Sequence, residues 1–256
     1  MKAIILAAGY ATRLYPLTKD FPKPLLEVGG QTILDYLIDQ LKTIPELDHA
    51  YIVTNSRFHS HFTDWAQNRA AQAQDSEQAH VGLRTDILDD GTFSNDDRLG
   101  AVGDLQFVIQ ARDIHDDILV LAADNILQFS LQTFINIFKN NPNTHITIRS
   151  NPDVEDRKRR GNARLGENHE VIEFIEKPET SISEWSVPPV YIYPTTVLPR
   201  INEYLDNGGN PDAPGHLIEW LHKEETVYAH EIEGEIIDIG NHESLAAARR
   251  IFGEDQ

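Results

Sequence analysis

The stretch Met1–Val28, MKAIILAAGYATRLYPLTKDFPKPLLEV, decides the fold that the rest of the chain completes. Its residues Ala3–Ala8 form a short apolar run, which is typical of a strand buried on both faces of a parallel sheet. The run ends at Gly9, where the chain needs a sharp turn or a close approach to a ligand. A buried strand leading into a loop with fixed cations predicts a phosphate-binding site, although many α/β proteins without one also begin this way. The polar residues of that loop stand among three prolines and are Thr12, Arg13, Thr18, Lys19 and Lys23.

Strands and helices alternate along the following residues, which predicts an α/β fold with an open, mostly parallel sheet. Thr32 is placed to cap a helix that runs to about Lys42, because apolar residues recur on one face at helical spacing. A second strand is expected at 50–53, a helix at about 60–73 and a third strand near 80–85. Further along, the pattern predicts strands at 117–124, 145–149, 190–193 and 227–232 and a hairpin over 162–177. It also predicts a helix that runs to about 111 and helices near 131–140, 214–221 and 242–252.

Composition limits the class of protein. The 256 residues can bury the core of one large domain, and 40% hydrophobic with 25% charged residues is ordinary for a soluble globular chain. A net charge of −19 argues against nucleic-acid binding, which depends on Lys and Arg neutralising phosphates. No apolar run reaches the roughly 18–20 residues of a membrane span, so no membrane partner is expected. The absence of cysteine excludes disulfides and thiolate metal sites, and fits a cytoplasmic protein.

The segment LAAGYATRLYPLTKDFPKPLLEVGG resembles the motif LAAGxGTRLxPLTxxxPKxLxxV of the sugar-1-phosphate nucleotidyltransferases, including glucose-1-phosphate thymidylyltransferases and mannose-1-phosphate guanylyltransferases. The resemblance implies a Rossmann-like, GT-A-like nucleotidyltransferase fold: a mostly parallel mixed sheet flanked by helices, with a small sugar-binding lobe. It also implies that Arg13 and Lys23 act catalytically at the triphosphate. Ala11 departs from the family's second loop glycine. The nucleotide-binding residues implied here are Leu6, Ala7, Ala8, Gly9 and Thr12.

Two later segments resemble further landmarks of the nucleotide site. The run LGAVGDL at 99–105 resembles the family's LGTAGAL-type turn, where Gly100 and Ala101 would approach the base with free helix N-terminal amides. The strand DILVLAAD ends in Asp124, a position that by itself also suits an aspartate capping the next turn. Because Ala123–Asn125 resembles the GDN motif, Asp124 is expected to bind both magnesium and the nucleotide, and Asn125 the acceptor.

The remaining landmarks concern the acceptor and the second metal ligand. The basic run Arg157–Arg160 is either solvated surface or an attractor of anions, and Gly161 corresponds to the glycine of the family's RYG turn. Arg160 stands where an aromatic residue is usual. The EKP segment implies that Glu176 holds sugar hydroxyls and that Lys177 meets the acceptor phosphate as a catalytic residue. EIIDIG resembles the WxDIGT segment, which makes Asp238 the second ligand of Mg²⁺.

The resemblance as a whole implies an enzyme that uses Mg²⁺ to join an NTP and a sugar 1-phosphate into an NDP-sugar with release of pyrophosphate. One domain, 1–256, is expected, with the nucleotide-binding part at about 1–150, the acceptor-binding part at about 151–240 and a C-terminal helix at about 242–253. Two alternatives stay open. Arg160 and Pro188–Pro189 favour transfer to a non-sugar phosphate or phosphonate, as in cytidylyltransferases, and Ala11 favours an inactive nucleotide-binding regulator. The base, the acceptor, and the choice between monomer and homo-oligomer also stay open.

Overall fold

The computed structural model describes residues 1–74 and 82–253, and its chain divides into two compact units. Unit 1 comprises Met1–Arg98, Ala122–Gln128 and Gly234–Gln256. Unit 2 comprises Leu99–Leu121 and Phe129–Glu233. The units therefore interleave along the sequence, whereas the expected binding parts were divided once, near residue 150. That division concerns which ligand each part binds, and it stays a prediction.

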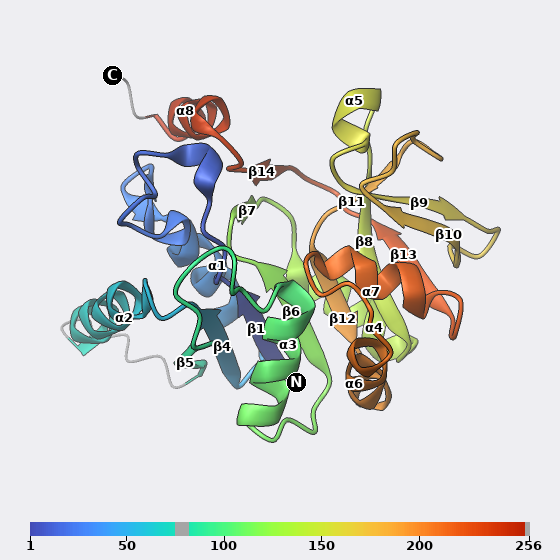
Figure 1. Cartoon of the computed structure of the whole chain (residues 1–256), viewed down its shortest axis with the longest axis horizontal. Helices are drawn as coiled ribbons and strands as arrows, with labels where there is room; N and C mark the ends of the chain where they lie inside the picture. The colour runs from blue at the N-terminus through green and yellow to red at the C-terminus, as the bar shows by residue number, and fades with distance from the viewer. Residues whose placement is uncertain (75–81, 254–256) are drawn as a thin grey trace. The chain divides into compact units, whose positions relative to one another are not determined.

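Unit 1 contains three parallel strands in the order β1 (Lys2–Leu6), β4 (His49–Thr54) and β5 (Arg84–Asp89). Every residue of β4 is buried, as an apolar strand between two neighbours requires. The strand expected near 80–85 lies later, because β5 pairs with β4 from Arg84 to Asp89; the part of that expectation at 80 and 81 falls outside the described residues. Helix α2 (His59–Gln74) packs against β5 (Figure 1).

Helix α1 (Ile33–Lys42) begins where the sequence predicts. The Thr32 hydroxyl accepts a hydrogen bond from the Asp35 amide, and the Asp35 carboxylate accepts one from the Thr32 amide. This reciprocal capping box satisfies two amide groups that a helix start otherwise leaves unpaired. The buried face holds the predicted residues, among them Leu34 and Leu41.

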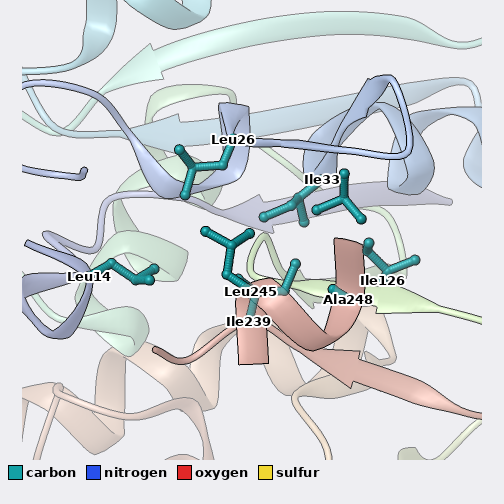
Figure 2. Packing of buried hydrophobic residues seen from close by; sticks show 8 residues of the cluster. Leu14, Leu26, Ile33, Ile126, Ile239, Leu245 and Ala248 are labelled. Carbon is teal, nitrogen blue, oxygen red and sulfur yellow. The ribbon is translucent and has the colours of Figure 1, made fainter. Parts of the chain in front are cut away.

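Short elements of unit 1 surround one apolar cluster, shown in Figure 2. They are two 3₁₀ turns, η1 (Thr12–Leu14) and η2 (Lys23–Leu25), the hairpin β2 (Glu27–Val28) with β3 (Gln31–Thr32), the antiparallel pair β7 (Asn125–Leu127) with β14 (Ile236–Asp238), and α8 (His242–Ile251). Segments more than 200 residues apart in sequence thus share one core. The apolar cluster consists of Leu14, Leu26, Val28, Ile33, Ile126, Ile239, Leu245 and Ala248.

Unit 2 contains a mixed sheet. Strand β12 (Val190–Tyr193) is antiparallel to both of its neighbours, β6 (Ile118–Ala122) and β8 (Thr144–Ser150). Strand β13 (Val227–Glu231) runs parallel to β8. The predicted hairpin is present as β9 (Gly161–Leu165) and β10 (Val171–Glu176), and β11 (Trp185–Val187) joins it to β8.

Six helical segments complete unit 2 (Figure 1). The predicted helix at 131–140 is confirmed with those bounds, and the helix predicted to run to about 111 ends at Ala111. Helix α7 packs against β10, and α3 packs against both α6 and α7. Within the described residues, no helix is long and apolar enough to cross a membrane. The segments are α3 (Ala101–Ala111), α4 (Leu131–Asn140), α5 (Val154–Arg157), η3 (Thr195–Val197), α6 (Leu198–Asp206) and α7 (Pro214–Leu221).

The basic run at 157–160 differs from the expected open loop, because it begins in the last residue of α5. The Arg160 guanidinium donates to the Asp156 carboxylate at 2.8 Å, and the Lys158 ammonium donates to Glu155 at 2.6 Å. Arg157 donates to the carbonyl of Ser183. Three of the four cations are therefore engaged within unit 2, which weakens any attraction of the run for a distant anion.

Candidate active site

Lys23 and Asp124, two of the predicted site residues, form an ion pair in unit 1. The Lys23 Nζ lies 2.7 Å from Asp124 Oδ2, and it also donates to the carbonyl oxygen of Ile239 at 2.8 Å. Lys23 is 9% exposed, which is rare for lysine and requires such partners. One buried ammonium therefore joins three segments: η2, the turn after β6 and the end of β14.

The Asp124 carboxylate is held in its ionised form. Burial raises the pKa of this carboxyl, but the charge and hydrogen bond of Lys23, with a smaller contribution from Arg13, hold the pKa below its usual value. The Asn125 side-chain amide donates to Asp124 Oδ1 at 2.7 Å, so both carboxylate oxygens accept hydrogen bonds. The group is charged at neutral pH and its oxygens have fixed directions.

Asp238 lies beside this pair through the β7–β14 ladder. Its register partner is Asn125, and the Ile239 amide donates to the carbonyl oxygen of Asp124 at 3.1 Å. Residues directly opposite in an antiparallel pair point to the same face, so the Asp238 and Asn125 side chains share one face. The same carboxylate-bearing segments that the sequence predicts to bind metal are thus adjacent.

The two carboxylates, Asp124 and Asp238, fit a magnesium ion that is bound partly by the protein and partly by the substrate. Among the residues that the structure describes, no group of three or more carboxylates and imidazoles could hold a metal by itself. Mg²⁺ commonly uses one or two carboxylates and completes its shell with waters and substrate phosphates. Asp124 and Asp238 match that pattern, so they would hold the ion together with a phosphorylated substrate.

The loop after β1 is anchored at both ends. The Asn55 side-chain amide donates to the Ala8 carbonyl at 2.8 Å, and the Thr18 hydroxyl donates to the Ala11 carbonyl at 2.8 Å. A Cβ added at Gly9 would meet no atom within 4 Å, so packing within the described residues does not require glycine there. Thr12 and Arg13 are exposed on η1, available to a ligand.

Ala11 adopts the left-handed conformation, with φ 45° and ψ 43°. This region favours glycine, because the Cβ of an L-residue crowds the backbone there. The alanine that departs from the family motif therefore keeps a glycine-like backbone.

Unit 2 brings together the predicted acceptor residues Gly161 and Glu176. The Glu176 side chain lies in a narrow slot: a Cβ on Gly161 would be 3.1 Å from Glu176 Oε2, and one on Gly215 would be 2.0 Å from it. The same Cβ on Gly161 would be 2.7 Å from Phe174 Cζ, so Phe174 and Glu176 together leave no room for a side chain at these two glycines. Gly215 stands in the first turn of α7 and was missed by the sequence reasoning, which treated it as part of a helix start.

The Glu176 carboxyl has a strongly perturbed pKa. Burial raises it to about 7; Lys177 opposes the rise, whereas the nearby carboxylates of Glu219 and Asp212 add to it. Among the described residues, no hydrogen bond to this carboxyl is found. Lys177 itself is exposed, with a left-handed φ of 51° and its amide donating to the Arg160 carbonyl. Titratable groups with such environments cluster at functional sites.

The start of α3 corrects one expectation. Free amides for a ligand were expected at this helix start, but the amides of Ala101 and Val102 donate to the backbone carbonyls of Asp212 and Pro211, at 3.2 and 2.9 Å. Gly100 has φ 80°, and a Cβ there would be 2.5 Å from the Pro211 oxygen. The glycine is therefore explained by contact with the segment before α7, which sequence spacing could not reveal.

Comparison with known proteins identifies the family of the chain. The nucleotidyl transferase family model matches residues 2–254. A UTP–glucose-1-phosphate uridylyltransferase of Synechocystis sp. is 25% identical over 250 residues, covering 94% of this chain and 60% of its own length. The catalytic subunit beta of mannose-1-phosphate guanylyltransferase from Xenopus tropicalis is 25% identical over 245 residues, covering 94% and 61%.

A solved UDP-glucose pyrophosphorylase, complexed with UDP-glucose, has a TM-score of 0.81 at 18% identity and covers 100% of this chain and 99% of its own. This likeness confirms the mixed α/β, GT-A-like fold. The chain spans only 51–60% of the length of three curated relatives that it matches. With the family model extending over nearly all of its residues, the chain belongs to the nucleotidyl transferase family.

Proposed function

We propose that the protein is a sugar-1-phosphate nucleotidylyltransferase, which joins an NTP and a sugar 1-phosphate into an NDP-sugar and releases pyrophosphate. The observation that supports this best is the centre formed by Lys23, Asp124 and the Ile239 carbonyl, with Asp238 on the adjacent strand. It combines a fixed ammonium with two carboxylates at a strand end, where ligands of open α/β sheets bind.

Each group of unit 1 has a role in that reaction. Arg13, exposed on η1 and always charged, binds the departing pyrophosphate through paired hydrogen bonds. Lys23 orients Asp124 and, when the NTP is bound, lies close to its phosphates. A bound Mg²⁺, held by Asp124 and Asp238, would supply a Lewis acid that neutralises phosphate charge. The phosphate oxygen of the acceptor is already anionic, so the reaction needs no general base, only alignment and charge stabilisation.

Apart from Asn125 in unit 1, the proposed acceptor residues lie in unit 2. Glu176 forms hydrogen bonds with sugar hydroxyls from its slot beside Gly161, and the exposed ammonium of Lys177 binds the sugar phosphate. Removal of a single group that stabilises the transition-state charge costs about 3–4 kcal/mol, or roughly 10²–10³ in rate. Lys177 and Arg13 are the residues for which that loss is expected.

The test is a screen of pyrophosphate release with four NTPs and a panel of sugar 1-phosphates. UTP and GTP come first, because the relatives are named for uridylyl and guanylyl transfer. Asp124→Asn is expected to lower turnover by about 10²–10³. Asp113→Asn is the matched control, since Asp113 is exposed and its carboxylate pairs with the exposed His115. Equal turnover in the Asp124 variant and the wild type would overturn the proposal.

The panel also includes phosphocholine-like alcohols and phosphonates. Two features favour them: Arg160 occupies the usual aromatic position and is held by Asp156, and Pro188–Pro189 precedes β12. Turnover with these compounds alone would replace the sugar part of the proposal. Tight nucleotide binding without turnover of any acceptor would instead indicate the inactive regulator.

A further inference from the structure

Helix α7 contacts the end of β10 at the residue that is proposed to bind the acceptor. The backbone amide of Glu176 donates to Glu219 Oε2 at 3.3 Å. The Glu219 side chain is 33% exposed, so its carboxylate reaches the backbone of half-buried Glu176 from the surface of α7. Glu219 was not among the residues that the sequence indicated, because a lone glutamate on a short helix carries no motif.

A chain of polar side chains orients Glu219. The Asn210 side-chain oxygen Oδ1 accepts from the Asp212 amide at 3.0 Å, which directs the Asn210 side-chain NH₂ toward His216 Nε2, also at 3.0 Å. His216 Nε2 is therefore an acceptor, and the ring proton lies on Nδ1. That Nδ1 faces Glu219 Oε2 at 3.6 Å. The order is Asn210, His216, Glu219 and then the amide of Glu176.

We propose that Glu219, oriented by Asn210 and His216, is a positioning residue that holds Glu176 in the acceptor subsite and sets whether that subsite presents a neutral carboxyl or a carboxylate. The inference rests on the proposed function and deepens it. A neutral carboxyl donates one hydrogen bond to an oxygen of the acceptor, whereas a carboxylate only accepts and repels an anionic phosphate. Near neutral pH the subsite therefore favours a phosphorylated polyol whose oxygen at this position accepts a hydrogen bond from Glu176.

The groups that face Glu176 support this role. They are Lys177 on the same segment, Asp212 and Glu219 from the α7 side, and Tyr191 from β12. Burial is the largest reason that the pKa of Glu176 rises to about 7, and Glu219 is the first of the two carboxylates that raise it further. Lys177 is the only cation among these groups within the described residues, and it lowers the pKa.

The experiment measures KM for the sugar phosphate and kcat between pH 6 and 8.5, at saturating NTP, in the wild type and in Glu219→Gln. The wild-type KM is expected to rise above about pH 7, as Glu176 loses its proton. In the variant, removal of the like charge of Glu219 moves the midpoint of the Glu176 titration down by about half a pH unit. This shift raises KM at pH 7 about twofold, with kcat nearly unchanged. Glu155→Gln is the matched control, because Glu155 is exposed on α5 and pairs with Lys158.

A second readout needs no turnover. In protein labelled with ¹³C at the glutamate carboxyls, the Glu176 signal is identified by its loss in Glu176→Gln, and its titration is compared between the wild type and Glu219→Gln. The same midpoint in both would overturn the role of Glu219. A midpoint that moves while KM keeps its pH dependence would overturn the link to the acceptor. Absence of turnover with every acceptor would refute the proposed function, and the ¹³C titration would still decide the role of Glu219.

Discussion

Replacement of Lys23 by methionine tests the centre of unit 1 directly. Methionine keeps most of the length and apolar stem of lysine but removes the ammonium that bonds Asp124 at 2.7 Å and the Ile239 carbonyl at 2.8 Å. Two acceptors then lose their partner at once. Lys23 itself is almost fully buried, so the apolar replacement is tolerated by the surrounding residues.

The magnitude follows from these two contacts. A hydrogen bond to a charged group contributes about 1.5–3 kcal/mol, and an unsatisfied buried carbonyl costs about 1–3 kcal/mol. The Asp124 side chain is 36% exposed, so solvent screens its share and the lower end of the range applies. We expect Lys23→Met to lower the free energy of unfolding by about 2–3 kcal/mol at pH 7. Most of this cost arises because the Asp124 carboxylate loses its partner. The effects of Lys23→Met and Asp124→Asn on the free energy of unfolding should therefore be strongly non-additive, with a coupling of about 1–2 kcal/mol.

Urea unfolding followed by circular dichroism measures the cycle of two single variants and the double variant. The pH dependence is a second check. Because the pKa of Asp124 is depressed in the folded protein, its pairing stabilises the fold above about pH 4 and is lost as pH falls below that value. The cost of Lys23→Met should therefore shrink at low pH. Additive single effects, or a cost that is independent of pH, would refute the assignment of Lys23 as the partner of Asp124.

Three further predictions concern stability. Ala11→Gly should raise the free energy of unfolding by about 0.5–1 kcal/mol, because relief of the left-handed φ exceeds the entropy cost of glycine; an unchanged or lower urea midpoint would contradict this. Glu176→Gln should stabilise the protein by about 2 kcal/mol at pH 8 and by little at pH 4. The reason is that the pKa of Glu176 is about 7 in the folded protein, so the wild type loses stability as pH rises from the unfolded-state pKa of a glutamate toward 7. Equal effects at both pH values would count against it. His145 donates from Nε2 to the Asn141 carbonyl, so its Nδ1 accepts from His230 Nε2 at 2.7 Å, and burial lowers the pKa of His230 to about 4. Stability should then fall by about 2 kcal/mol between pH 7 and pH 5, and His230→Gln, whose amide can still donate, should flatten that slope in thermal unfolding.

Local sequence predicted the elements that local physics determines. The helix after Thr32 could be located because a cap, an apolar face and a last-turn lysine all occur within eleven residues. The strand near 80–85 was misplaced because its position depends on pairing with β4, which no local pattern encodes. Likewise, the glycine at 100 was identified correctly as a special position, but its partner, the Pro211 carbonyl, lies 111 residues away.

The candidate site shows the same division between motif and packing. Asp124, Asp238 and Lys23 could be named from their motifs, yet the carbonyl of Ile239 and the carboxylate of Glu219 could not, because a backbone oxygen and a lone glutamate have no sequence pattern. The Ile239 carbonyl nevertheless accepts from the Lys23 ammonium, and the Glu219 carboxylate accepts from the Glu176 amide.

The apolar cluster explains why distant motifs meet with fixed geometry. Three polar site residues each precede a member of it in the sequence: Arg13 precedes Leu14, Asn125 precedes Ile126, and Asp238 precedes Ile239. Figure 2 labels these three apolar members. Leu14 and Ile239 are fully buried and Ile126 is 1% exposed, so rotation of any of these segments would expose an apolar side chain. Fully burying such a side chain contributes about 1.5–3 kcal/mol, which resists that rotation. Each buried apolar residue therefore fixes the orientation of its segment, and with it the position of the polar site residue beside it. A variant such as Ile239→Ala should consequently impair alignment as well as stability, since it loosens the segment whose carbonyl holds Lys23 and whose neighbour is Asp238.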